Sequence, residues 1–139
     1  MEKTLKVFAI LDGKAKAMVI KRDLHAYYDL LGCDLVDILQ RKIGGKTYNF
    51  VIDEEGRLKD GNHLSAILDK PGYSEILVGN MFVAGNIAGN LTSLKDEQIE
   101  EIAKHVGTAK ADIARPTEYE TVKVHKGDAV LTYSIGPTL

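Results

Sequence analysis

The segment best suited to chemistry is a run rich in Gly, Asn and hydroxyl residues at 85–95. It follows an apolar stretch at 75–84 and leads into a helical pattern that begins near Ser93. Flexible backbone N–H groups next to a helix N-terminus form a common phosphate-binding arrangement. The segment therefore predicts an anionic ligand or nucleotide site. Its candidate ligand-binding residues are Gly85, Asn86, Gly89, Asn90, Thr92, Ser93 and Lys95.

The same segment also has a simpler interpretation. It lacks the lysine pattern of nucleotide-binding P-loops and the glycine fingerprint of dinucleotide sites. Asp96 and Glu97 follow directly, and their charges would repel an anion. A connecting loop in which Gly and Asn adopt positive φ angles would explain the composition equally well. Both interpretations stay open at the level of sequence.

Three further groups could do chemistry. Cys33 is a potential nucleophile, but it should follow a helix C-terminus, where the dipole disfavours a thiolate, so we expect a buried structural cysteine. His25 and Asp29 share a helix face at metal-pair spacing, but a third ligand is not identifiable. The acidic cluster at 53–56 could hold a divalent cation, yet it equally suits a solvated turn. We assign no catalytic residue, metal site or cofactor.

Overall charge and composition exclude several function classes. The net charge of -2 supplies no basic field for nucleic acid, and the absence of Trp weakens the case for a base-stacking surface. No apolar stretch approaches the roughly 20 residues that span a bilayer, and the first residues show no signal-peptide pattern. A single cysteine excludes an intramolecular disulfide. We therefore expect a cytoplasmic protein that contacts neither membrane nor nucleic acid.

Hydrophobic periodicity and turn signals predict the elements that would position these residues. Alternating or continuous apolar patterns predict strands, which occupy 4–11, 15–20, 33–39 with a continuation to 43, 47–52 and 75–84. Spacings of three and four predict helices, which occupy 24–31, a segment from Asn62 to Pro71, and Ser93 to Gly107. Residues 85–91 are then a loop, 108–117 a connector, and 119–125 with 129–135 a hairpin.

These elements predict an α+β fold with a mixed, mainly antiparallel sheet, about three helices and an added C-terminal β-hairpin. We expect residues 1–107 to form the core domain, to which the connector and hairpin at 108–139 are appended. Ala129, Leu131, Tyr133 and Ile135 make an apolar stripe on one face of the last strand. Because an isolated hairpin is marginal in water, the stripe should dock on the core or form a homodimer.

Three segments resemble a known family. They are Tyr48 to Leu58, Ile76 to Gly85 and Thr92 to Ile99, and their order is similar to that in the phage and mobile-element proteins of domain of unknown function 3846. The sequence departs from that pattern around Asn62 and throughout 108–139. The resemblance implies a phage, prophage or plasmid product inside a bacterial host cell. It brings no established activity and no catalytic residue.

The sequence thus favours a small non-enzymatic binding or interaction protein of a phage or mobile element, with a host or phage protein as partner. One alternative is an anion or nucleotide binder that uses residues 85–95. Another is an enzyme whose site is assembled only in the fold. A cleft that joins Cys33 or a histidine to Asp53 or Glu55 would favour the enzyme. A flat apolar face around the C-terminal hairpin would favour the interaction protein.

Overall fold

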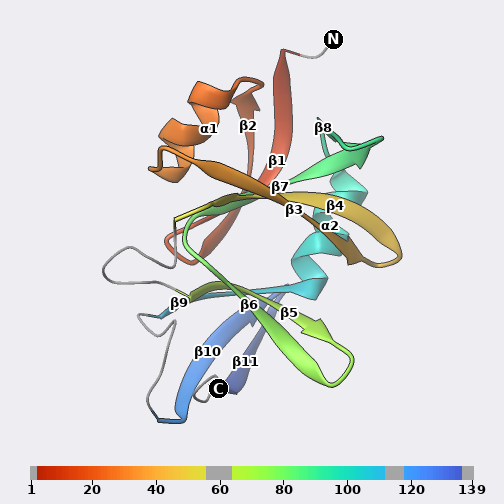
Figure 1. The fold of residues 1–139 in the computed structure, drawn as a ribbon. Helices are drawn as coiled ribbons and strands as arrows, with labels where there is room; N and C mark the ends of the chain where they lie inside the picture. Colours follow the sequence, from red (N-terminus) through yellow and green to blue (C-terminus); the bar gives the residue numbers. More distant parts are fainter. Residues whose placement is uncertain (1–2, 56–63, 112–117, 136–139) are drawn as a thin grey trace.

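The computed structural model describes residues 3–55, 64–111 and 118–135, which form two facing antiparallel sheets and two helices (Figure 1). The expectation of about three helices with mainly one sheet is therefore wrong. The described part of the chain is mostly β, and its strands divide between two sheets. The prediction failed at two segments, 64–70 and 75–84. Their local sequence patterns do not show which strands they pair with or that they contribute to two different sheets.

The first sheet contains β2, β1, β7, β4 and β3 in spatial order, with a short β8 paired to the end of β7. The strand bounds are Thr4–Leu11 for β1, Lys14–Lys21 for β2, Val36–Ile43 for β3, Lys46–Asp53 for β4, Met81–Ile87 for β7 and Asn90–Thr92 for β8. The predicted strands at 4–11, 15–20 and 47–52 are confirmed. Tight turns at Gly13 and at Gly44 and Gly45, which have positive φ angles, join the outer hairpins.

The second sheet contains β11, β10, β9, β5 and β6 in spatial order. The strand bounds are Leu64–Lys70 for β5, Tyr73–Val78 for β6, Val106–Ala111 for β9, Glu120–Lys126 for β10 and Ala129–Ile135 for β11. The predicted hairpin at 119–135 is confirmed, and it extends this sheet through β9. Residues 108–111, expected in a connector, belong to β9.

The helix predicted after Asn62 is a strand. Leu64, Ile67 and Leu68 are spaced by three and one, which imitates a helical face, but β5 pairs with β6 on one side and β9 on the other. Leu68 faces the core between the sheets, whereas Ile67 packs in a cluster on the opposite face. A strand buried on both faces shows no alternation of polar and apolar residues, so its period is hidden. Asn62 lies outside the described residues.

The single central strand predicted at 75–84 is two strands in different sheets. Gly79, with φ of 91°, turns the chain between β6 and β7. The loop predicted at 85–91 is also wrong, because residues 85–87 continue β7 and residues 90–92 form β8. Ala88 and Gly89 take the two positive φ angles of a tight turn between them.

The first helix, α1 at Leu24–Leu31, is confirmed together with its caps. Asp23 accepts a hydrogen bond from the Ala26 N–H at 2.8 Å, and Gly32 ends the helix in the left-handed conformation. The second helix, α2, covers Asp96–His105. Its N-cap is Lys95 instead of Ser93, and it ends before Gly107, because residues from Val106 onward pair with β5.

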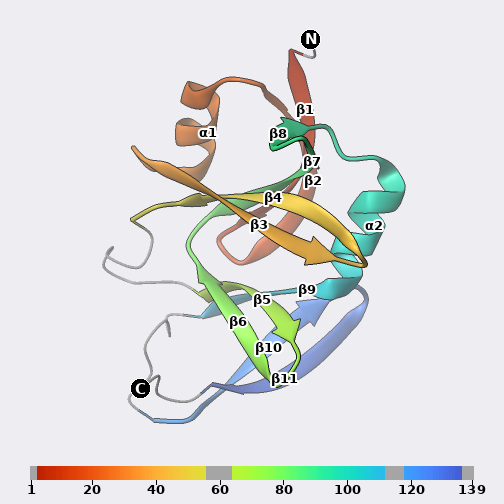
Figure 2. The same ribbon diagram turned by 45° about the vertical axis from the view of Figure 1, so that its right-hand side comes forward.

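The main core lies between the two sheets, and α2 runs beside both of them (Figure 2). Phe50 and Met81 from the first sheet, Leu68 from the second and Ile102 from α2 meet there. On the outer face of the first sheet, α1 covers a second cluster, in which the Tyr27 and Phe82 rings lie 5.1 Å apart. Within the described residues, no helix is long and apolar enough to cross a membrane.

Candidate functional site

A cleft of about 600 Å³ opens where the β7–β8 hairpin meets the start of β4 and the first turn of α2. We call it the basic cleft, and its lining residues are Arg22, Lys46, Thr47, Asn86, Ile87, Thr92, Ser93, Lys95 and Gln98. It therefore brings together Asn86, Thr92, Ser93 and Lys95 of the predicted ligand-binding set. Gly85, Gly89 and Asn90 belong to the hairpin behind it and are not among its lining residues.

Three cations on the basic cleft come from separate parts of the chain. Arg22 follows β2, Lys46 opens β4, and Lys95 is the N-cap residue of α2. Among the described residues that line the cleft, none is acidic. The lining thus carries three formal positive charges at neutral pH, together with hydroxyl and amide groups that can donate hydrogen bonds.

The acidic residues that follow Lys95 do not dominate this cleft. Asp96 forms an ion pair with the Lys6 ammonium, and it lies outside the lining. The Lys6 backbone N–H in turn donates to Ser93 Oγ at 3.0 Å, which ties β1 to the segment between β8 and α2. At the helix start, Gln98 Oε1 accepts the Lys95 N–H at 2.8 Å. The first turn of α2 is therefore held by its own side chains, and the Asp96 charge is partly compensated by Lys6.

A buried asparagine positions the β7–β8 hairpin behind the cleft. Asn49 is fully buried in β4, and its Nδ2 donates to the carbonyl oxygens of Gly85 at 3.1 Å and Asn90 at 3.4 Å. This one side chain therefore holds both strands of the hairpin. Asn86 Oδ1 accepts the Gly89 N–H at 2.9 Å and stabilises the turn. A Cβ at position 85 would lie 2.4 Å from Thr92 Oγ1 and 3.2 Å from the Thr92 carbonyl oxygen, so a larger residue there would force the hairpin to shift.

Arg22, Lys46 and Thr47 line the cleft but do not belong to the ligand-binding set predicted from sequence. They are separated from the 85–95 segment by tens of residues, and no local motif connects them to it. They reach the cleft because β4 pairs with β7, and because β1 pairs with both β2 and β7. Only the strand pairing could have identified them.

A second cleft, of about 320 Å³, gathers Cys33 with Asp53 and Glu55, the combination that we expected of an enzyme. Asp29 and Asp34 also line it. A nucleophilic thiolate needs positive charge nearby, whereas the described lining residues carry four carboxylates and no basic group. Cys33 itself is half-buried and packs against the cluster under α1. The arrangement does not favour a thiol nucleophile.

This acidic cleft has no metal-binding cluster either. Within the described ranges, no three His, Cys, Asp or Glu side chains are close enough to share an ion. Asp53 uses Oδ1 to accept the Glu55 N–H at 2.9 Å, which is a turn interaction. His25 does not line the cleft, so the predicted His25 and Asp29 pair does not gain a third ligand here.

Comparison with family models adds one match. The model described as Domain of unknown function (DUF3846) matches residues 5–107, well over half of the chain. The chain belongs to the DUF3846 family. Comparisons with curated proteins and with solved structures find no match. Every residue that lines the basic cleft falls within the DUF3846 segment, whereas β10 and β11 lie beyond it.

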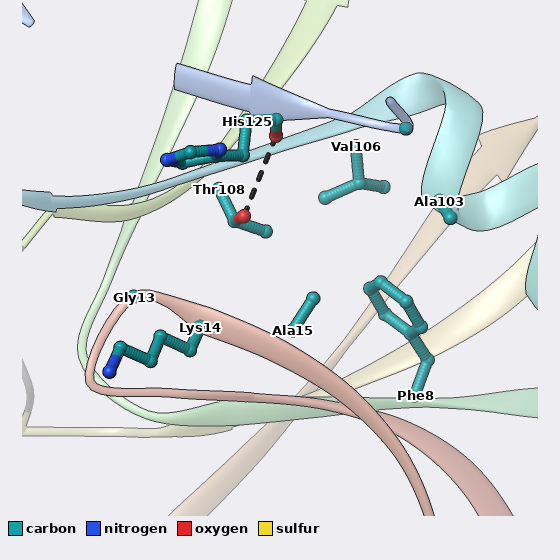
Figure 3. Close-up of a pocket in the computed structure, with 9 residues that line it drawn as sticks. Phe8, Gly13, Lys14, Ala15, Ala103, Val106, Thr108 and His125 are labelled. Atoms are coloured by element: carbon teal, nitrogen blue, oxygen red, sulfur yellow. Dashed lines mark hydrogen bonds between the residues drawn. The ribbon is translucent and has the colours of Figure 1, made fainter. Parts of the chain in front are cut away.

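A third cleft, of about 500 Å³, lies where the DUF3846 segment meets the C-terminal hairpin. Figure 3 shows Ala15 and Val106 facing each other across it, with Phe8 at one side and the His125 ring at the other. Its walls are mainly apolar. The contact from Thr108 Oγ1 to the His125 carbonyl oxygen is long, at 3.5 Å. The described residues that line this cleft include no carboxylate that could orient the His125 ring, and we assign His125 no catalytic role.

An exposed carboxylate anchors the C-terminal hairpin to the DUF3846 segment. Asp69 in β5 accepts hydrogen bonds from Lys126 Nζ at 2.6 Å, the Tyr133 hydroxyl at 3.0 Å and the Ser74 hydroxyl at 3.0 Å. The Lys126 hydrogen bond holds the pKa of Asp69 below its usual range. Burial, and then the hydrogen bond to Asp69, raise the pKa of the Tyr133 hydroxyl. The network spans four strands of the second sheet and has a structural role.

Proposed function

We propose that this DUF3846 protein is a non-enzymatic binding protein that takes a small phosphorylated ligand in the basic cleft. The observation that carries the proposal is the convergence of Arg22, Lys46 and Lys95 on one hollow whose described lining residues include no carboxylate. Three cations held close together on a surface repel one another, and a bound anion relieves that repulsion.

The cleft has the donors that a phosphate group needs. The Arg22 guanidinium can bind two phosphate oxygens at once, while Lys46 and Lys95 act as point charges. The hydroxyls of Thr92 and Ser93 add neutral donors from the segment just before α2. These groups would surround a phosphate from several sides, which is the usual way of binding it tightly.

The volume indicates a ligand larger than inorganic phosphate. A cleft of about 600 Å³ falls in the range of small-molecule sites, roughly 300–1,000 Å³. The Ile87 side chain lines the cleft and is 68% exposed, so it offers an apolar surface to an organic group. A nucleotide combines such a group with phosphate, and we take it as the ligand class.

The cellular setting is part of the proposal. The resemblance to proteins of phages and mobile elements supports an accessory factor that works in the cytoplasm of a bacterial host. A binding role also agrees with the basic cleft, because its described lining residues include no histidine or carboxylate that could act as a general base. A regulatory or sequestering factor needs only the binding step.

Isothermal titration calorimetry with AMP, ATP and inorganic phosphate tests the proposal. We expect AMP or ATP to bind more tightly than phosphate, and Arg22→Gln or Lys95→Gln to weaken binding by roughly tenfold each, the value of a lost charge-assisted hydrogen bond. Lys16→Gln is the matched control, because Lys16 is an exposed lysine on β2 outside the cleft. No binding at millimolar nucleotide, or an equal loss with Lys16→Gln, would overturn the proposal.

A further inference from the structure

Among the described strands, β11 ends the second sheet and has a paired strand on one side alone. Four strands end the two sheet paths, namely β2, β3, β6 and β11. Proteins usually protect such edges with charged side chains or proline, because unpaired backbone groups recruit other strands. Lysines at 14, 16 and 21 protect β2, charged residues at 37, 41 and 42 protect β3, and Glu75 protects β6. The seven residues of β11 include neither a charge nor a proline.

The composition of β11 favours pairing. Its described side chains are mostly β-branched, aliphatic or aromatic, and several are exposed although they are apolar. Val130 is 57% exposed and Leu131 is 39% exposed. Tyr133 lies on the same face as Leu131, and Asp69 holds its hydroxyl. On its outer side, β11 therefore combines backbone groups that pair with no described strand with an ordered apolar surface.

The hairpin register shows which backbone groups are free. Gly127 and Asp128 form a two-residue turn, with Lys126 directly opposite Ala129. In such hairpins the two residues next to the turn form a hydrogen-bonded pair. Along the strands, pairs with backbone hydrogen bonds then alternate with pairs without them. Leu131 therefore directs its N–H and C=O toward β10. Val130, Thr132 and Ser134 direct theirs outward to the open edge.

We infer that β11 pairs antiparallel with β11 of a second copy, around a two-fold axis at Thr132. In this register the outward N–H and C=O groups of Thr132 bond to those of the other Thr132, and Val130 lies opposite Ser134. Leu131 then lies opposite Tyr133 in a pair without hydrogen bonds, where side chains approach most closely. Two aliphatic–aromatic pairs and one Thr–Thr pair result, and both kinds stabilise antiparallel sheets.

Self-complementarity is the reason to choose a second copy as the partner. A two-fold interface must place each residue opposite a residue of the same strand, so a single charge near the axis would meet its own copy. β11 avoids that repulsion, and its free hydrogen-bonding residues are symmetric about Thr132. The contact joins the five-stranded sheets of two copies into one continuous sheet. It covers the β11 edge of each copy and leaves the β6 edges at the two ends of the joined sheet.

Disulfide trapping tests this register directly. Residues in a hydrogen-bonded antiparallel pair have Cα atoms about 5.5 Å apart, which suits a disulfide. In a Cys33→Ser background, Thr132→Cys should therefore give a covalent dimer under mild oxidation. Thr121→Cys is the control, because Thr121 is exposed on the neighbouring strand β10, one position in from the edge. Equal cross-linking of both variants, or none at Thr132, would overturn the register.

Sedimentation velocity gives an independent readout. The unmodified chain should show a concentration-dependent dimer, and Thr132→Lys should weaken association at least tenfold because two lysines then meet at the axis. Thr121→Lys should leave association unchanged. Circular dichroism should show the same fold for all three proteins, because Thr132 is exposed. A chain that stays monomeric up to high micromolar concentration, or a Thr132→Lys variant that dimerises normally, would refute the dimer.

Discussion

Gly107 provides the sharpest test of the packing in the second sheet. It lies in β9 opposite Ile67, and a Cβ at this position would be 2.5 Å from Val124 Cγ1. Carbon atoms in contact normally lie about 3.5–4.0 Å apart. Val124 is fully buried in β10, so it has little room to move aside. Gly107→Ala should therefore destabilise the fold by about 1–3 kcal/mol, and Gly107→Val by more.

The cause differs from the one that local sequence suggests. A helix ending at Gly107 would require glycine for its left-handed conformation, but the helix ends earlier and Gly107 is part of a strand. The predicted loss of stability thus follows from steric contact and not from φ. Because the contact is with one side chain, a second substitution can remove it.

A double-mutant cycle distinguishes these causes. Val124→Ala removes the Cγ1 atom and should cost about 1–3 kcal/mol by itself, because it leaves a cavity. The double variant Gly107→Ala with Val124→Ala should lose at least about 1 kcal/mol less free energy of unfolding than the sum of the losses of the two single variants. Urea unfolding followed by circular dichroism measures all four proteins. Val122→Ala is the control, since Val122 is buried on the same strand but is not among the atoms nearest Gly107. Additive costs in both cycles would refute the steric explanation.

Three further predictions concern side chains away from the basic cleft. Arg41 and Glu75 form a bidentate pair between β3 and β6, with distances of 2.8 and 2.9 Å, so Arg41→Met should lower the free energy of unfolding by about 1 kcal/mol in urea melts. The hydrogen bond from Lys126 lowers the pKa of Asp69 in the folded protein. The contact therefore stabilises the fold above the ordinary carboxyl pKa, and this stability is lost as pH falls through the lower folded pKa. In acid unfolding, Asp69→Asn should lose less stability between these two pKa values than the unmodified protein does. Cys33 should react with a thiol reagent more slowly than a free thiol, since its cleft is acidic; equal rates would contradict this.

Much of the first sheet could be predicted from sequence because its signals are local. The Asp12 and Gly13 turn between 4–11 and 15–20 depends on neighbouring residues alone. The same holds for α1, whose caps Asp23 and Gly32 act within one turn of the helix. The hairpin at 119–135 is also recognisable, because its strands alternate and its turn contains glycine. Steric preferences and hydrogen bonds at short range are sufficient to form these elements.

Only tertiary structure decided the rest. The segment at 64–70 is a strand because both of its faces are buried by other elements, and burial on two faces removes the periodicity that would distinguish it from a helix. Residues 75–84 divide between two sheets at Gly79, although they are the most apolar run in the chain. Arg22, Lys46 and Lys95 converge because strands distant in sequence pair with one another. Four of the nine residues that line the cleft belong to the set predicted from local sequence, and long-range strand pairing brought Arg22, Lys46 and Thr47 beside them.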